Sequence, residues 1–383
     1  MMPMTPIDPV ALTQTLVRAN TVNPPGNEDL CTTPLADLLS AAGFDCRTVE
    51  FAPRRRSLIA RLGGRAGRLP LCFTGHVDVV PLGAAPWQHD PFGAEIVDGR
   101  MYGRGSSDMK SGVAAFAAAA IGLADRLRDS AGLTLIITAG EETGCEGAFH
   151  LVGSDEGRAQ VGAAGALLVG EPTGNAPLLG HKGAFWLSAH VSGTTAHGSM
   201  PEQGDNAVYK MARAALALEA FRFDTGAHPL MGAPTLKVGT AHGGLNINSV
   251  PDAAELGIDI RSVAGQDHRQ VLQCLCRVLG PQVRLRTLLD VASVYTEPDD
   301  PWLQRVLALC QARSGQAAQP RTASYFTDAA ALRGPLGQPP TVILGPGEAA
   351  MAHQTDEYCR VDHIVEAMAL YEDLIRDWCE VAA

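Results

Sequence analysis

Short apolar runs alternate with amphipathic segments along the first half of the chain. The runs predict buried or half-buried strands, because each is short and bounded by turn residues. These strands are expected near 46–51, 57–62, 69–75, 133–138 and 166–170. Helices are expected over 8–20, from the high twenties to Gly43, after Asp108 and over roughly 146–153. Strands that alternate with helices favour a largely parallel sheet with helices on both faces.

The pattern changes after Glu171. Strands are expected over 183–193, 235–242, 253–262 and 283–290, and helices over 206–221 and 268–279. This βαββαβ order is that of a split ferredoxin-like unit. Residues 300–383 return to helix, a strand at 341–345 and a terminal helix near 361–379. We therefore predict an α/β fold whose first domain, 1–177 and 293–383, is interrupted by an inserted α+β domain over 178–292.

Five residues with metal-binding side chains stand at the ends of five separate hydrophobic runs or just before a helix. They are His76, Asp108, Glu142, Glu171 and His353. In an open parallel sheet, the loops that leave the carboxyl ends of the strands converge on one crevice. Two imidazoles and three carboxylates suit a pair of divalent ions such as zinc. The sequence therefore predicts a two-metal hydrolase.

Two acidic residues close to these ligands, Asp78 and Glu141, are expected to have roles other than metal binding. Asp78 lies two positions after His76 in an extended segment, so its carboxylate is placed to accept the second imidazole N–H. Glu141 precedes Glu142 after an apolar strand. Adjacent side chains cannot both point the same way, so one is expected to bind metal while the other acts as a general base.

Each motif also has an ordinary structural explanation when taken alone. A histidine such as His76 is commonly buried and inert, and an aspartate before a helix, such as Asp108, is commonly an N-cap. Gly345, Gly347 and Ala350 even fit the G-x-G-x-x-A dinucleotide fingerprint. Fewer than forty residues follow, too few for a mononucleotide-binding half. The coincidence of four such residues at strand ends, with Asp108 just before a helix, favours the metal site over a dehydrogenase.

Length, charge and cysteine content limit the number of domains, the partners and the cellular compartment of the protein. At 383 residues the chain exceeds the size at which a single hydrophobic core stops growing, so two domains are expected. A net charge of −11 disfavours nucleic acid as a partner. Nine thinly spread cysteines, and a start without the features of a secretory signal, predict a cytoplasmic protein. The longest apolar stretch, 112–124, is too short to span a bilayer, so no membrane partner is expected.

Seven segments together resemble one family of enzymes. They are FTGHVDVVP, GRGSSDMKSGVAA, TAGEETG, GEPTG, AHGSMPEQGDNAV, NSVPDAAELGIDIR and GPGEAAMAHQTDEY. In this order they resemble the acetylornithine deacetylase, succinyl-diaminopimelate desuccinylase and carboxypeptidase G family of co-catalytic metallopeptidases. HKG (181–183), DIR (259–261) and AHQTDEY (352–358) look most like acetylornithine deacetylase.

The resemblance implies how the metal ligands are shared. His76 and Glu171 would bind one ion, and Glu142 and His353 the other. Asp108 would bridge the two ions, with a cis peptide bond to Met109. The ions implied are zinc, with cobalt or manganese as alternatives.

The resemblance also implies roles for five further residues. Glu141 would be the general base, with Asp78 as the residue that orients His76. From the inserted domain, His197 would stabilise the oxyanion, and Asn248 and Arg261 would hold the carboxylate or carbonyl of the substrate. The inserted domain would serve as a lid and as the interface of a homodimer.

The implied activity is metal-dependent hydrolysis of the amide bond of an N-acyl-L-amino acid, as in acetylornithine deacetylase. A carboxylate and a free amino acid would be released. A dipeptidase or carboxypeptidase and a succinyl-diaminopimelate desuccinylase stay open as alternatives. A non-catalytic binding protein on the same fold is the alternative from another class.

Overall fold

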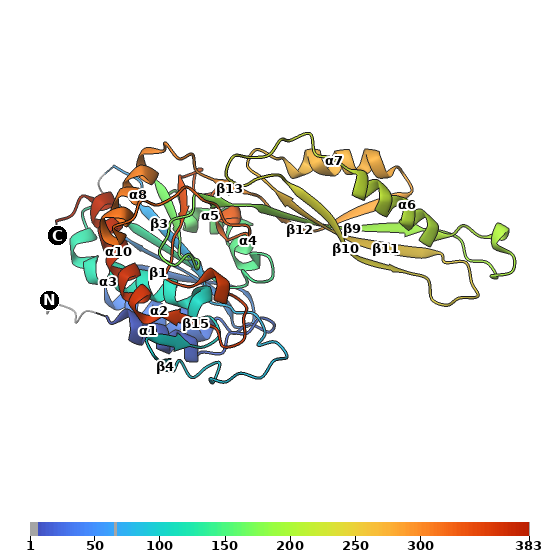
Figure 1. Ribbon diagram of the computed structural model, residues 1–383. Helices are drawn as coiled ribbons and strands as arrows, with labels where there is room; N and C mark the ends of the chain where they lie inside the picture. Colours follow the sequence, from blue (N-terminus) through green and yellow to red (C-terminus); the bar gives the residue numbers. More distant parts are fainter. Residues whose placement is uncertain (1–6, 65–66, 383) are drawn as a thin grey trace. The chain divides into compact units, whose positions relative to one another are not determined.

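The computed structural model describes residues 7–64 and 67–382 (Figure 1). Most of the start used in the secretory-signal argument lies outside these ranges. The chain forms two compact units. Unit 1 comprises the chain up to Gly180, Tyr295–Arg321 and Thr327 onward, and unit 2 comprises His181–Val294 and Thr322–Phe326. The segment 322–326 was not expected in the second unit. It belongs there because the Lys182 N–H donates to the Ala323 carbonyl at 3.1 Å.

Unit 1 is built on a six-stranded, mainly parallel sheet. Its order is β1 (Asp45–Ala52), β2 (Arg55–Leu62), β6 (Leu133–Thr138), β3 (Leu71–His76), β7 (Ala166–Val169) and β14 (Thr341–Ile343). β3 runs parallel to both β6 and β7, and β14 runs parallel to β7, whereas β1 and β2 are antiparallel. The predicted largely parallel sheet is confirmed.

Helices cover both faces of this sheet. They are α1 (Pro9–Arg18), α2 (Asp29–Ala41), α3 (Ser111–Leu127), α4 (Glu146–Val152), α5 (Asp155–Val161), α8 (Pro301–Ser314), α9 (Ala329–Leu332) and α10 (Val361–Cys379). On one face, Phe73 of β3 packs on Phe116 of α3 and Tyr371 of α10. Thr138 of β6 points to the opposite face, where it bonds Asp328, the residue before α9.

Local sequence explains how α3 approaches the sheet. The helix is rich in alanine, and nearly all of its residues are buried. A Cβ atom on Gly112, in its first turn, would lie 2.1 Å from the carbonyl oxygen of Gly170. Only glycine therefore allows the start of α3 to abut the segment that carries Glu171. None of the helices in the described parts of the chain is long and apolar enough to cross a bilayer.

Several short elements escaped sequence analysis, because two or three residues carry no periodic signal. β15 (Tyr358–Arg360), β5 (Arg100–Tyr102) and β4 (Ile96–Val97) form a small sheet. β8 (Gly180–His181) and β13 (Val294–Tyr295) occur where the chain passes between the units. The remaining short helices are η1 (Ser106–Lys110), η2 (Pro201–Gln203) and η3 (Ala349–Met351).

Unit 2 has the predicted βαββαβ order. Its antiparallel sheet runs β10 (Thr235–Gly243), β11 (Ala253–Ser262), β9 (Gly183–Ser192) and β12 (Val283–Val291). Helices α6 (Ala207–Ala220) and α7 (His268–Leu279) lie on one face of this sheet (Figure 1). The core joins Phe185 and Leu187 of β9 to Leu218 of α6 and Leu275 of α7. Alternating burial along β11 fits a sheet with a single covered face.

Candidate metal centre

Four adjacent strands of unit 1 deliver potential metal ligands to one edge of the sheet. His76 ends β3, Glu142 follows β6, Glu171 follows β7, and His353 follows β14. Because these strands are parallel, their carboxyl ends lie at the same edge. Asp108 reaches the same place from η1, in the segment that precedes α3.

Asp108 lies between the two imidazoles. Its Oδ1 is 3.3 Å from His76 Nε2, and its Oδ2 is 3.4 Å from His353 Nε2. His76 Nε2 is also 3.8 Å from Glu171 Oε1, and His353 Nε2 is 3.1 Å from Glu142 Oε2. All five predicted ligands are thus brought together in two groups that share Asp108. Metal binding by these residues stays a prediction.

The donor set fits divalent cations. The ligand atoms of His76, Asp108 and Glu142 all lie within 4.8 Å of one another. Glu142 Oε1 is buried and accepts no hydrogen bond from any described residue, and Asp108 Oδ1 has only His76 Nε2 near it. Buried acceptors without a donor are costly, and a cation satisfies them.

The pKa shifts of these residues also indicate a site that suits cations. Burial and the charge of Asp108 raise the pKa of both Glu142 and Glu171. Contact with Asp108 and Glu142 raises the pKa of His353 to about 10. Burial disfavours a charged His76, but Asp108 and Asp78 outweigh it, so the pKa of His76 lies well above its usual value. The site concentrates negative charge that protons or cations must neutralise.

Glu357 shapes the segment that carries Asp108, and sequence analysis did not single it out. Its buried carboxylate accepts backbone N–H bonds from Gly105 at 3.0 Å, Ser107 at 2.8 Å and Asp108 at 3.0 Å, and pairs with Arg104 at 2.7 Å. The residue at the N-cap of α3 is Lys110 and not Asp108, so the N-cap explanation is wrong. The peptide bond from Asp108 to Met109 is cis, as the resemblance implies. The only signal for Glu357 was its place in the AHQTDEY segment.

Glu357→Gln is expected to lower the free energy of unfolding by about 3 kcal/mol, because it breaks a buried ion pair and leaves backbone N–H groups facing an amide. Chemical denaturation measures this loss. Glu372→Gln is the matched control, because Glu372 pairs with Arg376 across one turn of α10 near the surface. That variant should lose less than about 1 kcal/mol. Equal losses in the two variants would contradict the assigned role.

Asp78 contacts its neighbours differently from the expectation. His76 Nδ1 is 2.9 Å from the backbone carbonyl oxygen of Asp78, whereas the carboxylate is 3.6 Å away. The Asp78 carboxylate instead accepts the backbone N–H groups of Glu141 and Glu142 at 3.1 and 3.2 Å. Asn23, which sequence analysis missed, donates to the same carboxylate at 3.0 Å. The backbone carbonyl of Asp78 therefore makes the closer contact to His76, and the carboxylate, which also lies near this ring, fixes the loop after β6.

Unit 2 contains three predicted site residues, His197, Asn248 and Arg261. Only the segments of His197 and Asn248 lie next to each other. The turn with His197 pairs with the segment of Asn248, and the Gly198 N–H donates to the Asn248 carbonyl at 2.7 Å. The Ser199 N–H donates to His197 Nδ1 at 3.2 Å, so Nε2 is the ring nitrogen of this exposed residue that stays available to another partner. Arg261 lies apart on β11, paired with Asp259 at 3.0 Å.

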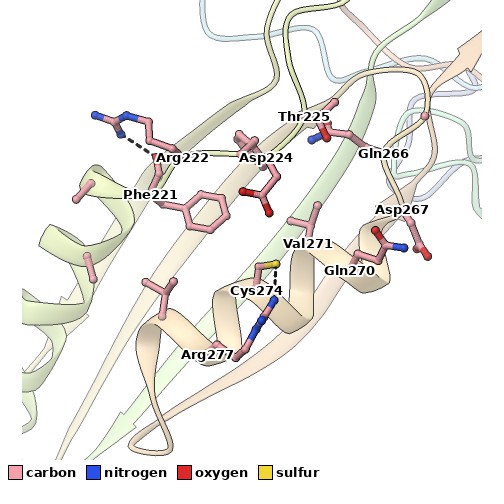
Figure 2. Close-up of a pocket in the computed structure, with 15 residues that line it drawn as sticks. Phe221, Arg222, Asp224, Thr225, Gln266, Asp267, Gln270, Val271, Cys274 and Arg277 are labelled. Atoms are coloured by element: carbon pink, nitrogen blue, oxygen red, sulfur yellow. Dashed lines mark hydrogen bonds between the residues drawn. The ribbon is translucent and has the colours of Figure 1, made fainter.

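A cavity of about 710 Å³ lies elsewhere in unit 2, between the end of α6 and the exposed side of α7. Figure 2 shows Phe221, Asp224, Cys274 and Arg277 around it. The predicted site residues do not line this cavity. This cavity is therefore separate from the candidate metal centre, which is identified by its converging side chains.

Fold and site define a class of protein: a mixed α/β protein with a candidate metal centre at the carboxyl edge of a mainly parallel sheet. Residues 72–377 match the sequence profile of peptidase family M20/M25/M40. The chain belongs to this family and is a metal-dependent hydrolase. This confirms the family inferred from the sequence.

Relatives and solved structures cover nearly the whole chain. A succinyl-diaminopimelate desuccinylase of Cereibacter sphaeroides is 33% identical and covers 97% of this chain and 99% of its own. An acetylornithine deacetylase of Vibrio cholerae is 31% identical over 92% of each chain. The structure resembles an M20 metallo-carboxypeptidase from Sulfolobus solfataricus, with a TM-score of 0.80, 18% identity and coverage of 98% and 100% of the two chains. It also resembles YXEP of Bacillus subtilis, a dinuclear metal-binding peptidase, with a TM-score of 0.71, 15% identity and 98% coverage of each.

Proposed function

We propose that the protein hydrolyses the amide bond of N-acyl-L-amino acids and releases a carboxylate and a free amino acid. The placement of Asp108 between His76 and His353, each beside a further carboxylate, carries this proposal. Relatives named as a desuccinylase and a deacetylase support the N-acyl amino acid class.

We propose zinc as the metal, with cobalt or manganese as substitutes. His76 and Glu171 would hold one ion, Glu142 and His353 the other, and Asp108 both. The nitrogen and oxygen donors of this set suit borderline divalent ions. When bound, such ions supply Lewis acidity that activates water and polarises the amide carbonyl.

Glu141 is the proposed general base. It is 5% exposed, and burial, followed by the charges of Glu171 and Asp328, raises its pKa well above the usual carboxyl range. A raised pKa suits a group that takes a proton from water and returns it to the departing amine. The backbone bonds from Glu141 and Glu142 to Asp78 fix the start of this side chain.

The residues of unit 2 are proposed to act on the substrate. His197 Nε2 would donate a hydrogen bond to the developing oxyanion. Arg261 would bind the substrate carboxylate, for which its planar guanidinium is suited, after exchanging its partner Asp259. Asn248 would hold a carbonyl or carboxylate oxygen beside His197.

The test is a panel of N-acetyl, N-succinyl and N-formyl amino acids, with dipeptides as a separate arm. Amine release is measured with and without added zinc or cobalt. Turnover of acyl amino acids supports the proposal, and the favoured acyl group identifies the substrate. Turnover of dipeptides alone would assign a dipeptidase, and bound metal without any turnover would assign a binding protein.

We further propose a homodimer formed through unit 2. Its sheet has two edge strands, β10 and β12, with backbone groups open to another strand. Leu245 and Ile247, which follow β10, are fully exposed, which is unusual for large apolar side chains. A second copy related by two-fold symmetry would cover such a surface.

If His197 acts across this dimer, mixing His197→Ala with Glu141→Gln should restore activity. When equal amounts of the two variants exchange subunits at random, half of the resulting dimers contain one subunit of each variant. Each mixed dimer has one intact active site and one doubly impaired site. Activity should therefore return to roughly a quarter of the wild-type level. Each variant alone is the control. A fully active monomer in ultracentrifugation, or no recovery after proven exchange, would show that His197 does not act in the partner's site.

We also propose a reducing location such as the cytoplasm. All nine cysteines are free, and five of them lie in buried positions of unit 1 strands and helices. Thiols persist unpaired in reducing compartments.

A further inference from the structure

A buried thiol touches the proposed general base. Cys145 immediately precedes α4 and is fully buried. Its Sγ donates to Glu141 Oε1 across 3.9 Å. The turn that joins them is closed by the Cys145 N–H, which donates to the Glu141 carbonyl at 2.9 Å. The thiol is therefore fixed relative to the carboxylate by the backbone between them.

A second carboxylate borders the same thiol. Asp328 is 2% exposed and accepts a hydrogen bond from the Thr138 hydroxyl through Oδ2. Its Oδ1 is buried and accepts no hydrogen bond of ordinary geometry, and the Cys145 thiol is a further neighbour of the carboxylate. After burial, the charge of Asp328 is the largest cause that raises the pKa of the Cys145 thiol. The thiol, with one proton, thus has a second carboxylate near it besides that of Glu141.

We propose that Cys145 is a positioning residue for Glu141, a role that rests on the proposed function. The thiol holds Oε1, so Oε2 stays free to accept the proton from water. A thiol is a weak donor, so it orients the carboxylate while withdrawing less basicity than a hydroxyl or amide donor would. Asp328, anchored by Thr138, is the second carboxylate near the sulfur.

The kinetic test compares Cys145→Ala with Cys145→Ser at full metal loading. Cys145→Ala should lower kcat about 3-fold, the rate equivalent of a hydrogen bond near the weak end of the usual range, with KM within about 2-fold of wild type. Cys145→Ser keeps a donor at the same place and should recover at least half of the lost kcat. Cys310→Ala, which removes a buried thiol from α8, is the matched control and should leave kcat unchanged. A wild-type kcat in Cys145→Ala, or equal loss in Cys145→Ser, would overturn the proposal.

Infrared spectroscopy tests the contact without substrate. The S–H stretching band of Cys145 is assigned by its loss in Cys145→Ser. Glu141→Gln and Asp328→Asn should each shift this band, because each changes a group that borders the thiol. A band that neither variant shifts overturns the contact even if Cys145→Ala folds poorly. If wild-type protein hydrolyses nothing in the panel, the proposed function fails, while a shifted band still supports the contact.

Discussion

Asp108→Ala is expected to lower turnover at least about 1000-fold, which corresponds to about 4 kcal/mol of activation barrier. Asp108 faces both His76 and His353 with separate oxygens, so its loss removes the shared ligand of both proposed metal positions. Metal content per chain should fall together with activity. Turnover and elemental analysis of the same dialysed sample measure the two effects.

Asp125→Ala is the matched control for this variant. Asp125 lies in α3 and makes an exposed pair with Arg128, outside the metal centre. Its removal should change neither metal content nor turnover. Full activity in Asp108→Ala, or in wild-type protein stripped by a chelator, would refute the two-metal mechanism.

Glu141→Gln is expected to lower turnover at least about 100-fold with metal content unchanged, the scale of a lost general base. Glutamine keeps the size of the side chain but cannot accept the proton. Glu142→Gln should act in the opposite sense, with weaker binding at one metal position, because Glu142 contacts His353 at 3.1 Å. Metal titration and turnover of the two variants separate these effects. If Glu141→Gln loses metal and Glu142→Gln retains it, the two roles are exchanged.

The sequence determined where the potential ligands lie, because their places follow from the ends of elements. β3 and β7 are buried throughout and mostly apolar, so their ends could be read directly from the chain. Parallel strands direct their carboxyl ends to one edge. His76 and Glu171, almost one hundred positions apart, could therefore be placed together before any coordinates were known.

The sequence could not show what holds these ligands in place. Glu357 binds the backbone of Gly105 and Ser107 across about 250 positions, and no local pattern marks such a contact. The Asp78 carboxylate lies 3.6 Å from His76 Nδ1, and it also receives the N–H groups of Glu141 and Glu142, which the spacing did not predict. Spacing along a strand specifies which face a side chain takes, but not which donors a later loop brings to it.

The sequence by itself thus determined the fold class, the edge of the sheet that carries the chemistry and the residues that meet there. Periodicity and strand ends are local properties, and parallel topology converts them into proximity. Only the tertiary structure decided the partners of Asp78 and Glu357 and the placement of Cys145 near Glu141 and Asp328. Those contacts depend on the packing of distant loops, where each buried donor and acceptor must find a partner that the chain supplies from elsewhere.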